Sequence, residues 1–282
     1  MVLYEMTKRL EKQKGLDGAA KMVGNFVGKV LPPGSAKDAL SGTWLGHTLH
    51  PVLTDLPIGA WTSATALDLV GGEESEEAAR RLIGLGILAS VPTALSGLAD
   101  YSDTMGEERR VGFTHAVFNV AALALFTASY GARRNGSSMK GKGLALLGMG
   151  AASAGAYLGG HLSLDMGVGV DHTAYESGPG EWTPTVPESE LEEGTATKVE
   201  VDGVDIFLTR YGGRVCALSD RCTHAGGPLN EGTIQGGTVQ CPWHGSVFSL
   251  EDGSVEQGPA RAPQPAYETR VVEGRVEVRS SE

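Results

Sequence analysis

Two short cysteine–histidine boxes lie near the C-terminus, Cys222-Thr223-His224-Ala225-Gly226 and Cys241-Pro242-Trp243-His244-Gly245-Ser246. They place two thiols and two imidazoles in the patterns C-x-H and C-x2-H, with several glycines between them. Glycine favours loops over the interior of strands and helices. Because thiolates and imidazoles are ligands of zinc and of iron–sulfur centres, the spacing predicts one loop-borne site for a metal ion or a binuclear cluster.

The sequence around the boxes has the residue pattern of a small β domain. Short runs of β-branched and aromatic residues alternate with turn dipeptides such as Asp252-Gly253 and Glu273-Gly274. This alternation predicts an all-β domain over residues 196–282. The preceding residues 169–195 are rich in proline, glycine and glutamate, which is typical of a linker.

Both boxes resemble those of Rieske iron–sulfur domains, and the resemblance extends over residues 196–280. It implies a [2Fe–2S] cluster with Cys222 and Cys241 on one iron and His224 and His244 on the other. It also implies that Ser246 supports the cluster through a hydrogen bond to a sulfur. A zinc site is the chemical alternative, because two cysteines and two histidines also suit zinc.

Two departures from the respiratory Rieske pattern bear on the reduction potential. Trp243 occupies a position where those proteins carry an extra disulfide-forming cysteine, and Phe248 stands where they carry a tyrosine hydroxyl. Hydrogen bonds around a cluster help to set its potential. The sequence therefore predicts a ferredoxin-like or intermediate potential. Cys216 lies in a predicted strand, where a small buried hydrophobic role is expected.

The N-terminal half has a different composition. It contains three nearly uncharged runs that end in charged residues, namely residues 82–99, 111–132 and 143–164. About 20 apolar residues of helix cross the hydrocarbon core of a bilayer. A weaker fourth run, residues 50–71, is interrupted by Asp55 and Asp68. Short connections favour antiparallel neighbours, so these runs predict a transmembrane four-helix bundle, with a buried soluble bundle as the alternative.

The predicted fold is thus an α-helical transmembrane four-helix bundle followed by an all-β Rieske-type domain. Residues 1–40 form a polar arm with an amphipathic stretch, residues 41–168 the membrane domain, residues 169–195 the linker and residues 196–282 the β domain. The helical half also resembles an uncharacterised bacterial family of small four-helix membrane proteins. His50-Pro51 and Gly159-Gly160-His161 are among the residues that carry this resemblance.

Three histidines of the helical half are expected at one membrane face. In an up-and-down bundle, His50 at the start of the first helix, His115 near the start of the third and His161 near the end of the fourth share one side. Ionisable groups at membrane depth are costly and usually functional. The three histidines therefore predict a haem, metal or quinone site, while polar residues facing lipid headgroups are the alternative.

Charge and composition define the expected function. The formal net charge of −11 excludes a general nucleic-acid binder, because neutralising phosphates needs surplus lysine and arginine. Residues 165–282 carry 20 of the 34 acidic residues, which favours a redox partner with a basic docking face. We expect a membrane-anchored, lipid-embedded electron carrier of a bacterial inner membrane, with its Rieske domain in the cytoplasm. A redox sensor without turnover and a ferredoxin-like component of a larger oxidoreductase are the alternatives.

Overall fold

The computed structural model describes residues 2–280 and divides into two compact units. The helical unit runs to Pro32 and resumes at Leu49–Val168, whereas the β unit comprises Pro33–Thr48 and the chain from Gly169 onward. This division differs from the predicted boundary after residue 40, because residues 33–48 pack with the C-terminal domain.

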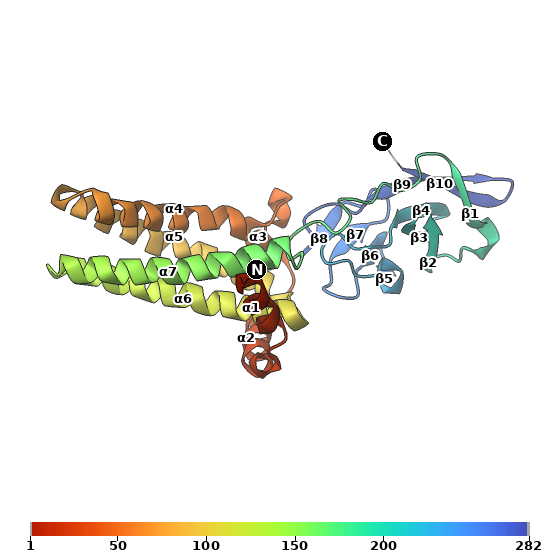
Figure 1. Ribbon diagram of the computed structural model, residues 1–282. Helices are drawn as coiled ribbons and strands as arrows, with labels where there is room; N and C mark the ends of the chain where they lie inside the picture. Colours follow the sequence, from red (N-terminus) through yellow and green to blue (C-terminus); the bar gives the residue numbers. More distant parts are fainter. Residues whose placement is uncertain (1, 281–282) are drawn as a thin grey trace. The chain divides into compact units, whose positions relative to one another are not determined.

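The helical unit is built from six α-helices within the described residues (Figure 1). They are α1 (Val2–Glu11), α2 (Asp17–Val30), α4 (Leu49–Val70), α5 (Glu76–Ser102), α6 (Gly106–Arg134) and α7 (Ser138–Leu164), with 3-10 turns at Lys14–Leu16 and Glu73–Ser75. α4 packs mainly along α5, and α6 packs mainly along α7. The four long helices therefore form two hairpins, α4–α5 and α6–α7.

Three helices in the described part of the chain are long and apolar enough to cross a membrane: Glu73–Ser102, Gly106–Arg134 and Ser138–Leu164. They contain the three uncharged runs and confirm that part of the prediction. α4 is 22 residues long and carries Asp55, Asp68 and an internal Pro57, and it is not one of these three. α2 is fastened to the end of α5, because Tyr101 Oη donates to Ala20 O at 2.9 Å. α1 is fastened to the start of α6, because Arg110 Nη1 donates to Glu11 O at 2.5 Å.

Three residue pairs, each 65 positions apart, meet between α4 and α6. The rings of His50 and His115 have centroids 6.2 Å apart. Trp61 stacks on Phe126 with centroids 4.2 Å apart and planes at 14°. Asp68 Oδ1 accepts a hydrogen bond from Arg133 Nη1 at 2.9 Å, in a buried ion pair.

Glycines repeat the same internal symmetry on the two other helices of the hairpins. A Cβ on Gly86 of α5 would lie 2.2 Å from Trp61, and a Cβ on Gly148 of α7 would lie 3.1 Å from Phe126. In each hairpin, therefore, a glycine lets the aromatic ring of the neighbouring helix lie against the backbone. The helical unit is an approximate repeat of one helix hairpin, and equivalent residues of α4 and α6 face each other.

The β unit contains two antiparallel sheets. The larger has the strand order β1-β10-β9-β4-β3-β2, and the smaller has the order β5-β6-β7-β8. The strands are β1 (Thr183–Pro187), β2 (Thr197–Val201), β3 (Val204–Tyr211), β4 (Arg214–Ser219), β5 (Thr233–Gln235), β6 (Thr238–Gln240), β7 (Val247–Ser249), β8 (Val255–Gln257), β9 (Ala266–Val272) and β10 (Arg275–Ser280). The unit also includes α3 (Ser35–Ser41) and 3-10 turns at Thr43–Leu45, Glu188–Glu190 and Leu229–Glu231.

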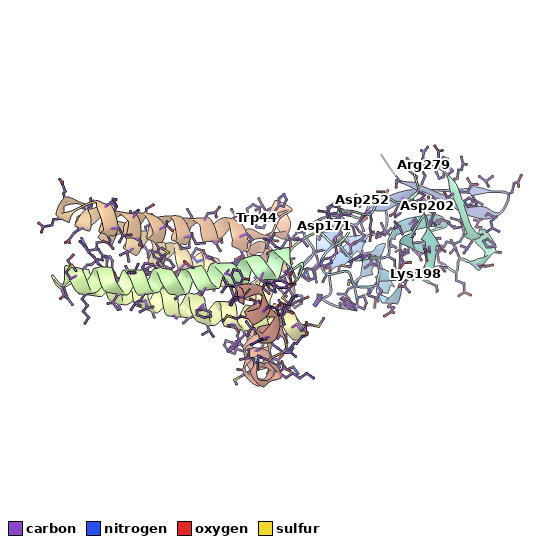
Figure 2. The ribbon with its side chains drawn as sticks, viewed as in Figure 1. Trp44, Asp171, Lys198, Asp202, Asp252 and Arg279 are labelled. Atoms are coloured by element: carbon purple, nitrogen blue, oxygen red, sulfur yellow. The ribbon has the colours of Figure 1, made fainter. Side chains whose placement is uncertain are left out.

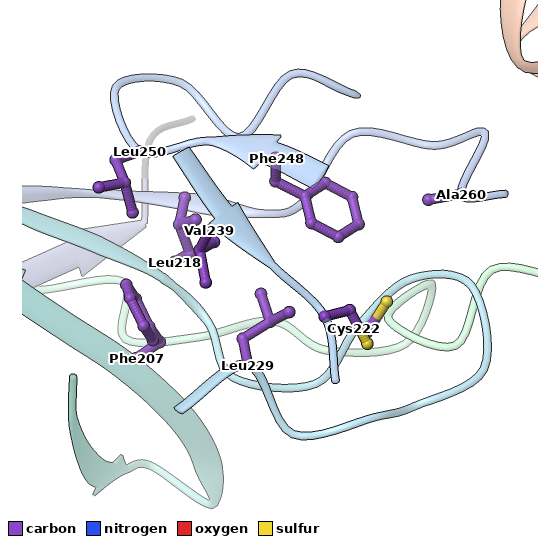
Figure 3. Close-up of a cluster of buried hydrophobic side chains, with 9 residues drawn as sticks. Phe207, Leu218, Cys222, Leu229, Val239, Phe248, Leu250 and Ala260 are labelled. Carbon is purple, nitrogen blue, oxygen red and sulfur yellow. The ribbon is translucent and has the colours of Figure 1, made fainter. Parts of the chain in front are cut away.

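A compact apolar core lies between the larger sheet and the smaller one. Phe207 of β3, Leu218 of β4, and Val239 and Phe248 of the small sheet are fully buried in it. Cys222 belongs to the same cluster (Figure 3). The cysteine boxes are therefore seated directly on this core.

Residues 169–195, predicted as a linker, pack on the β unit for much of their length. β1 pairs with β10, Ser280 N donates to Pro179 O at 2.7 Å, and Ser219 Oγ donates to Glu176 at 2.7 Å. The proline and glycine of this stretch are typical of a linker, but here they lie along an ordered edge of the sheet.

Candidate metal centre

The two boxes adopt the same tight loop. In the first, Cys222 N donates to Gly227 O at 2.9 Å and Gly226 N donates to Cys222 O at 2.8 Å. In the second, Cys241 N donates to Ser246 O at 2.8 Å and Gly245 N donates to Cys241 O at 3.1 Å. Gly226 and Gly245 both have positive φ, at +75° and +79°. A side chain in this left-handed region is strained, so the equivalent glycine closes each loop.

The loops bring the four predicted ligands together. Cys222 and Cys241 are 1% and 3% exposed, and the two thiols are hydrogen-bonded to each other. The rings of His224 and His244 have centroids 4.9 Å apart and planes at 85°. The structure thus brings the two sulfurs together and the two imidazoles together, with one of each on either loop.

The electrostatics of the site favour the metal-binding forms of Cys241 and His224, and the protonated form of Cys222. The pKa of Cys222 is raised far above its usual value, first because it shares a hydrogen bond with Cys241 and then because it is buried. The same hydrogen bond lowers the pKa of Cys241 to about 7. Burial, followed by the neighbouring His244 and Arg261, holds the pKa of His224 well below its ordinary value. A neutral imidazole and a readily formed thiolate are the species that bind metals.

The space beside the sulfurs fits a bound group. A Cβ on Gly227 would lie 2.9 Å from Cys241 Sγ and 3.0 Å from Trp243, so only glycine leaves this cradle open. The donor set also fits, since two cysteines and two histidines are the ligands of a Rieske-type [2Fe–2S] cluster. Both observations agree with the group that the sequence implies.

A loop that the sequence analysis did not single out ties both boxes together. Ala260 N donates to Ser246 Oγ at 3.0 Å, and Thr223 Oγ1 donates to Ala262 O at 3.0 Å. Gln264, 1% exposed, accepts from Thr223 N at 3.1 Å. Ser246 therefore bonds to this loop within the described structure. The glutamine between two prolines, at positions 263–265, is the sequence signal that could have pointed to this loop.

Residues 33–48 support the outer side of that loop. Arg261 Nε donates to Ser41 O at 2.7 Å, and Thr43 Oγ1 donates to Ala260 O at 3.4 Å. A Cβ on Gly258 would lie 2.6 Å from both Asp38 Oδ1 and Thr43 Oγ1. An N-terminal segment thus contributes to the surroundings of a C-terminal site.

Cys216 lies apart from the boxes on β4, half-buried and packed against the core cluster. Burial raises the pKa of its thiol. This placement agrees with the small hydrophobic role expected for it.

The three histidines predicted to share a membrane face, His50, His115 and His161, fall into two groups. His50 and His115 face each other as described above. His161 Nε2 instead lies 2.7 Å from Glu11 Oε1 of α1, and Lys8 completes the group by bonding Asp165 at 2.7 Å. The structure therefore pairs two of the predicted residues and gives the third a different partner, Glu11, which lies 150 positions away in the sequence.

Cysteine and histidine boxes on paired glycine loops, seated on a two-sheet β core, define an iron–sulfur domain. The chain belongs to the Rieske [2Fe-2S] domain family, whose model matches residues 181–268. Residues 46–172 match a second family, described as a predicted membrane protein (DUF2231). The chain is thus a fusion of these two domains, as the resemblances in the sequence implied.

Curated relatives match the Rieske part. Ferredoxin CarAc of Metapseudomonas resinovorans is 33% identical, over 34% of this chain and 92% of its own length. A 3-phenylpropionate/cinnamic acid dioxygenase ferredoxin subunit of Photorhabdus laumondii is 37% identical, over 33% of this chain and 89% of its own. Human apoptosis-inducing factor 3 is 33% identical over 33% of this chain, which spans only 15% of that protein.

Among solved structures, the ferredoxin of carbazole 1,9a-dioxygenase from Nocardioides aromaticivorans is 26% identical. The match covers 36% of this chain and 98% of the ferredoxin, with a TM-score of 0.34.

Proposed function

We propose that this chain is a membrane-anchored one-electron carrier whose [2Fe–2S] cluster is held by Cys222, Cys241, His224 and His244. The observation that carries the proposal is the convergence of two thiols and two imidazoles on equivalent glycine-closed loops. Such a cluster, when bound, accepts and releases one electron. The relatives named as ferredoxin subunits support the same activity.

The surrounding residues have a positioning role. The core beneath the cysteines excludes water from the sulfur side of the site. Ser246, fully buried, accepts a hydrogen bond from Ala260 N and is the hydroxyl that the resemblance implies as a partner of a cluster sulfur. Trp243, half exposed beside His244, offers an aromatic surface to a docking partner.

The partner is a redox protein with a basic docking face. Support comes from the acidic β unit, where side chains such as Asp202 and Asp252 stand out from the surface (Figure 2). Complementary charge accelerates the encounter of two proteins. Relatives named as ferredoxin subunits of dioxygenases also support the alternative of a ferredoxin-like component in a larger oxidoreductase.

The membrane part of the proposal is a transmembrane bundle of α4–α7 in a bacterial inner membrane, with the Rieske domain in the cytoplasm. Four crossings put both chain ends on one side. The basic arm, with lysines at positions 8, 12, 14 and 21, supports a cytoplasmic side for those ends. A second redox site, holding haem or quinone, is proposed among His50, His115 and His161. The contact of His50 with His115 supports the first two of these residues.

The test is the metal content and spectrum of the full chain purified in detergent. We expect equal amounts of non-haem iron and acid-labile sulfide, and an electron paramagnetic resonance signal of a reduced [2Fe–2S] cluster after dithionite. Cys222→Ser should abolish the acid-labile sulfide and the paramagnetic signal, whereas Cys216→Ser should keep the sulfide and the signal. Zinc without visible absorption would overturn the proposal, and failure to pass electrons to any added acceptor would favour the redox sensor.

A further inference from the structure

We propose that His50 and His115 are the two axial ligands of one haem iron within the helical unit. This deepens the second redox site of the proposed function, because it names the group and limits its protein ligands to two. The juxtaposition of these imidazoles across the internal repeat is the observation that carries it.

The spacing of the two rings fits one iron between them. An imidazole nitrogen lies about 2 Å from a bound metal ion, so two imidazoles on opposite sides of one metal have ring centres roughly 6 Å apart. The rings of His50 and His115 are 6.2 Å apart, centre to centre, with planes at 83°. This separation also lies within the range of ordinary edge-to-face ring pairs, such as Tyr4 and His161 at 6.1 Å, so the inference rests on the spacing together with the orientation of the nitrogens.

Hydrogen bonds orient both imidazoles for ligation. His50 Nδ1 lies 2.9 Å from Thr93 O, and His115 Nδ1 lies 2.8 Å from Gly155 O. A carbonyl oxygen only accepts, so each Nδ1 carries the proton and each Nε2 carries the lone pair. A histidine that ligates a metal typically donates its other ring N–H to such a carbonyl. Asn119 Nδ2 lies 3.0 Å from His115 Nε2, and with the proton on Nδ1 it donates to this lone pair, so the hydrogen bond must break when Nε2 binds iron.

The helix hairpins repeat this arrangement. Gly97 lies four residues after Thr93 on α5, and Gly159 lies four residues after Gly155 on α7. A Cβ on Gly97 would be 2.7 Å from His50 Cε1, and one on Gly159 would be 3.0 Å from His115 Cε1. Each imidazole therefore rests on a glycine of its own hairpin and is presented toward the other hairpin.

The interface between the hairpins is where a macrocycle would enter. α4 contacts α5 extensively and α6 contacts α7 extensively, whereas contacts between the hairpins are sparser. The large apolar side chains of this unit, such as Trp61 and Phe126, cluster about three helical turns from the histidine pair. Cofactor sites of helical bundles are built from side chains on facing helices, as here.

His161 is excluded from the ligand set by its own contacts. Its Nε2 faces Glu11 at 2.7 Å and Asp165 at 3.4 Å. Ionised carboxylates only accept, so this nitrogen of His161 carries the proton and not the lone pair, and we assign His161 to holding α1 against the bundle. In the redox step, one electron from a reduced carrier would convert ferric to ferrous haem, with no bond to the protein formed or broken.

The test is haem content of the full chain, made in haem-sufficient cells and purified in detergent. A pyridine haemochrome assay should give one haem b per chain with a low-spin spectrum. His50→Gly and His115→Gly should each lose the low-spin spectrum, and added imidazole should restore it. That rescue separates lost ligation from misfolding. Asn119→Ala, His161→Ala and the exposed His47→Ala should keep the spectrum.

Several results would overturn the inference. Haem-free wild-type protein that also fails to bind added haemin would do so, as would loss of the low-spin spectrum in His161→Ala. A co-purifying quinone whose binding depends on His50 and His115 would show that this site holds quinone and not haem. The cluster content is measured separately from the haem content. A protein that contains the cluster but no haem would refute this inference alone, and a protein that contains haem but no cluster would refute the proposed cluster alone.

Discussion

Ser246 Oγ accepts a hydrogen bond of 3.0 Å from the backbone N–H of Ala260. This bond joins the second cysteine box to the loop that also contacts Thr223 of the first box. One hydroxyl therefore links the ligand loops through a third segment of chain.

Replacing Ser246 by alanine should loosen the cluster site. The buried N–H of Ala260 would lose its acceptor, which costs about 1–3 kcal/mol. We expect faster loss of visible absorption when a chelator is added, together with a lower midpoint potential. Ser254→Ala, at a turn of the same unit, is the control. Unchanged cluster lifetime and potential in Ser246→Ala would contradict this role.

The glycines that close the two boxes should respond equally to substitution. Gly226→Ala and Gly245→Ala each place a side chain in the left-handed region, which costs about 1–2 kcal/mol. Both variants should contain less iron than the wild type after identical purification. Gly180→Ala, which meets no atom within 4 Å, should retain full iron content. A loss confined to one box would show that the loops are not equivalent.

The packing of residues 33–48 on the cluster domain can be probed at Gly258. Alanine there would place a Cβ 2.6 Å from Asp38 and Thr43, and such overpacking costs about 1–3 kcal/mol. We expect faster hydrogen exchange over residues 35–45, measured by mass spectrometry, and a less stable cluster. If exchange in this segment matches the wild type, the segment does not depend on that contact.

The buried ion pair of Asp68 and Arg133 predicts an asymmetric response to mutation. Arg133→Met leaves Asp68 buried without its cation, at a cost of about 3–5 kcal/mol. The double variant Arg133→Met/Asp68→Leu should recover most of the thermal stability in detergent. The neighbouring, exposed Arg134→Met should change it little. A double variant no more stable than Arg133→Met would count against this reasoning.

Tyr267 predicts an alkaline limit for the β unit. Burial, and secondarily Glu176, raises its pKa to about 12. The folded state thus keeps a proton that the unfolded state releases near pH 10, so stability falls as the pH rises from about 10 toward 12. The loss amounts to at most roughly 3 kcal/mol. Tyr267→Phe should flatten this part of the profile, measured by cluster absorption against pH; an unchanged slope would assign it to other groups.

Much of this organisation follows from local sequence. The spacing of Cys222, His224, Cys241 and His244 predicts the site because the ligand loops are short and glycine-closed. Uncharged runs predict the long helices because membrane depth and helix rise fix their length. The sequence predicts segment 33–48 as part of the arm and of the membrane domain, since its polar residues show no periodicity and its contacts with the loop at Ala260 and Arg261 span more than 200 residues.

The histidine pair illustrates the same limit. Placing His50 and His115 on one side of a bundle needs only helix order, but His161 was grouped with them because the sequence does not show Glu11 approaching it. The hairpin repeat was also missed. Several of its equivalent residues differ, with Trp61 matched to Phe126 and Asp68 matched to Arg133, and the few identical pairs stand out only once their contacts are known.

The chain passes between its two units three times, after Pro32, after Thr48 and after Val168. A protease that cut only near residue 168 would leave residues 33–48 covalently joined to the helical unit, and residues 169–282 would be held to them by non-covalent contacts alone. Likewise, a gene fragment beginning at residue 169 would encode a β unit without its own helix α3. Recombination that transferred the cluster domain as one contiguous segment would therefore leave residues 33–48, which pack on the cluster loop, behind in the donor chain.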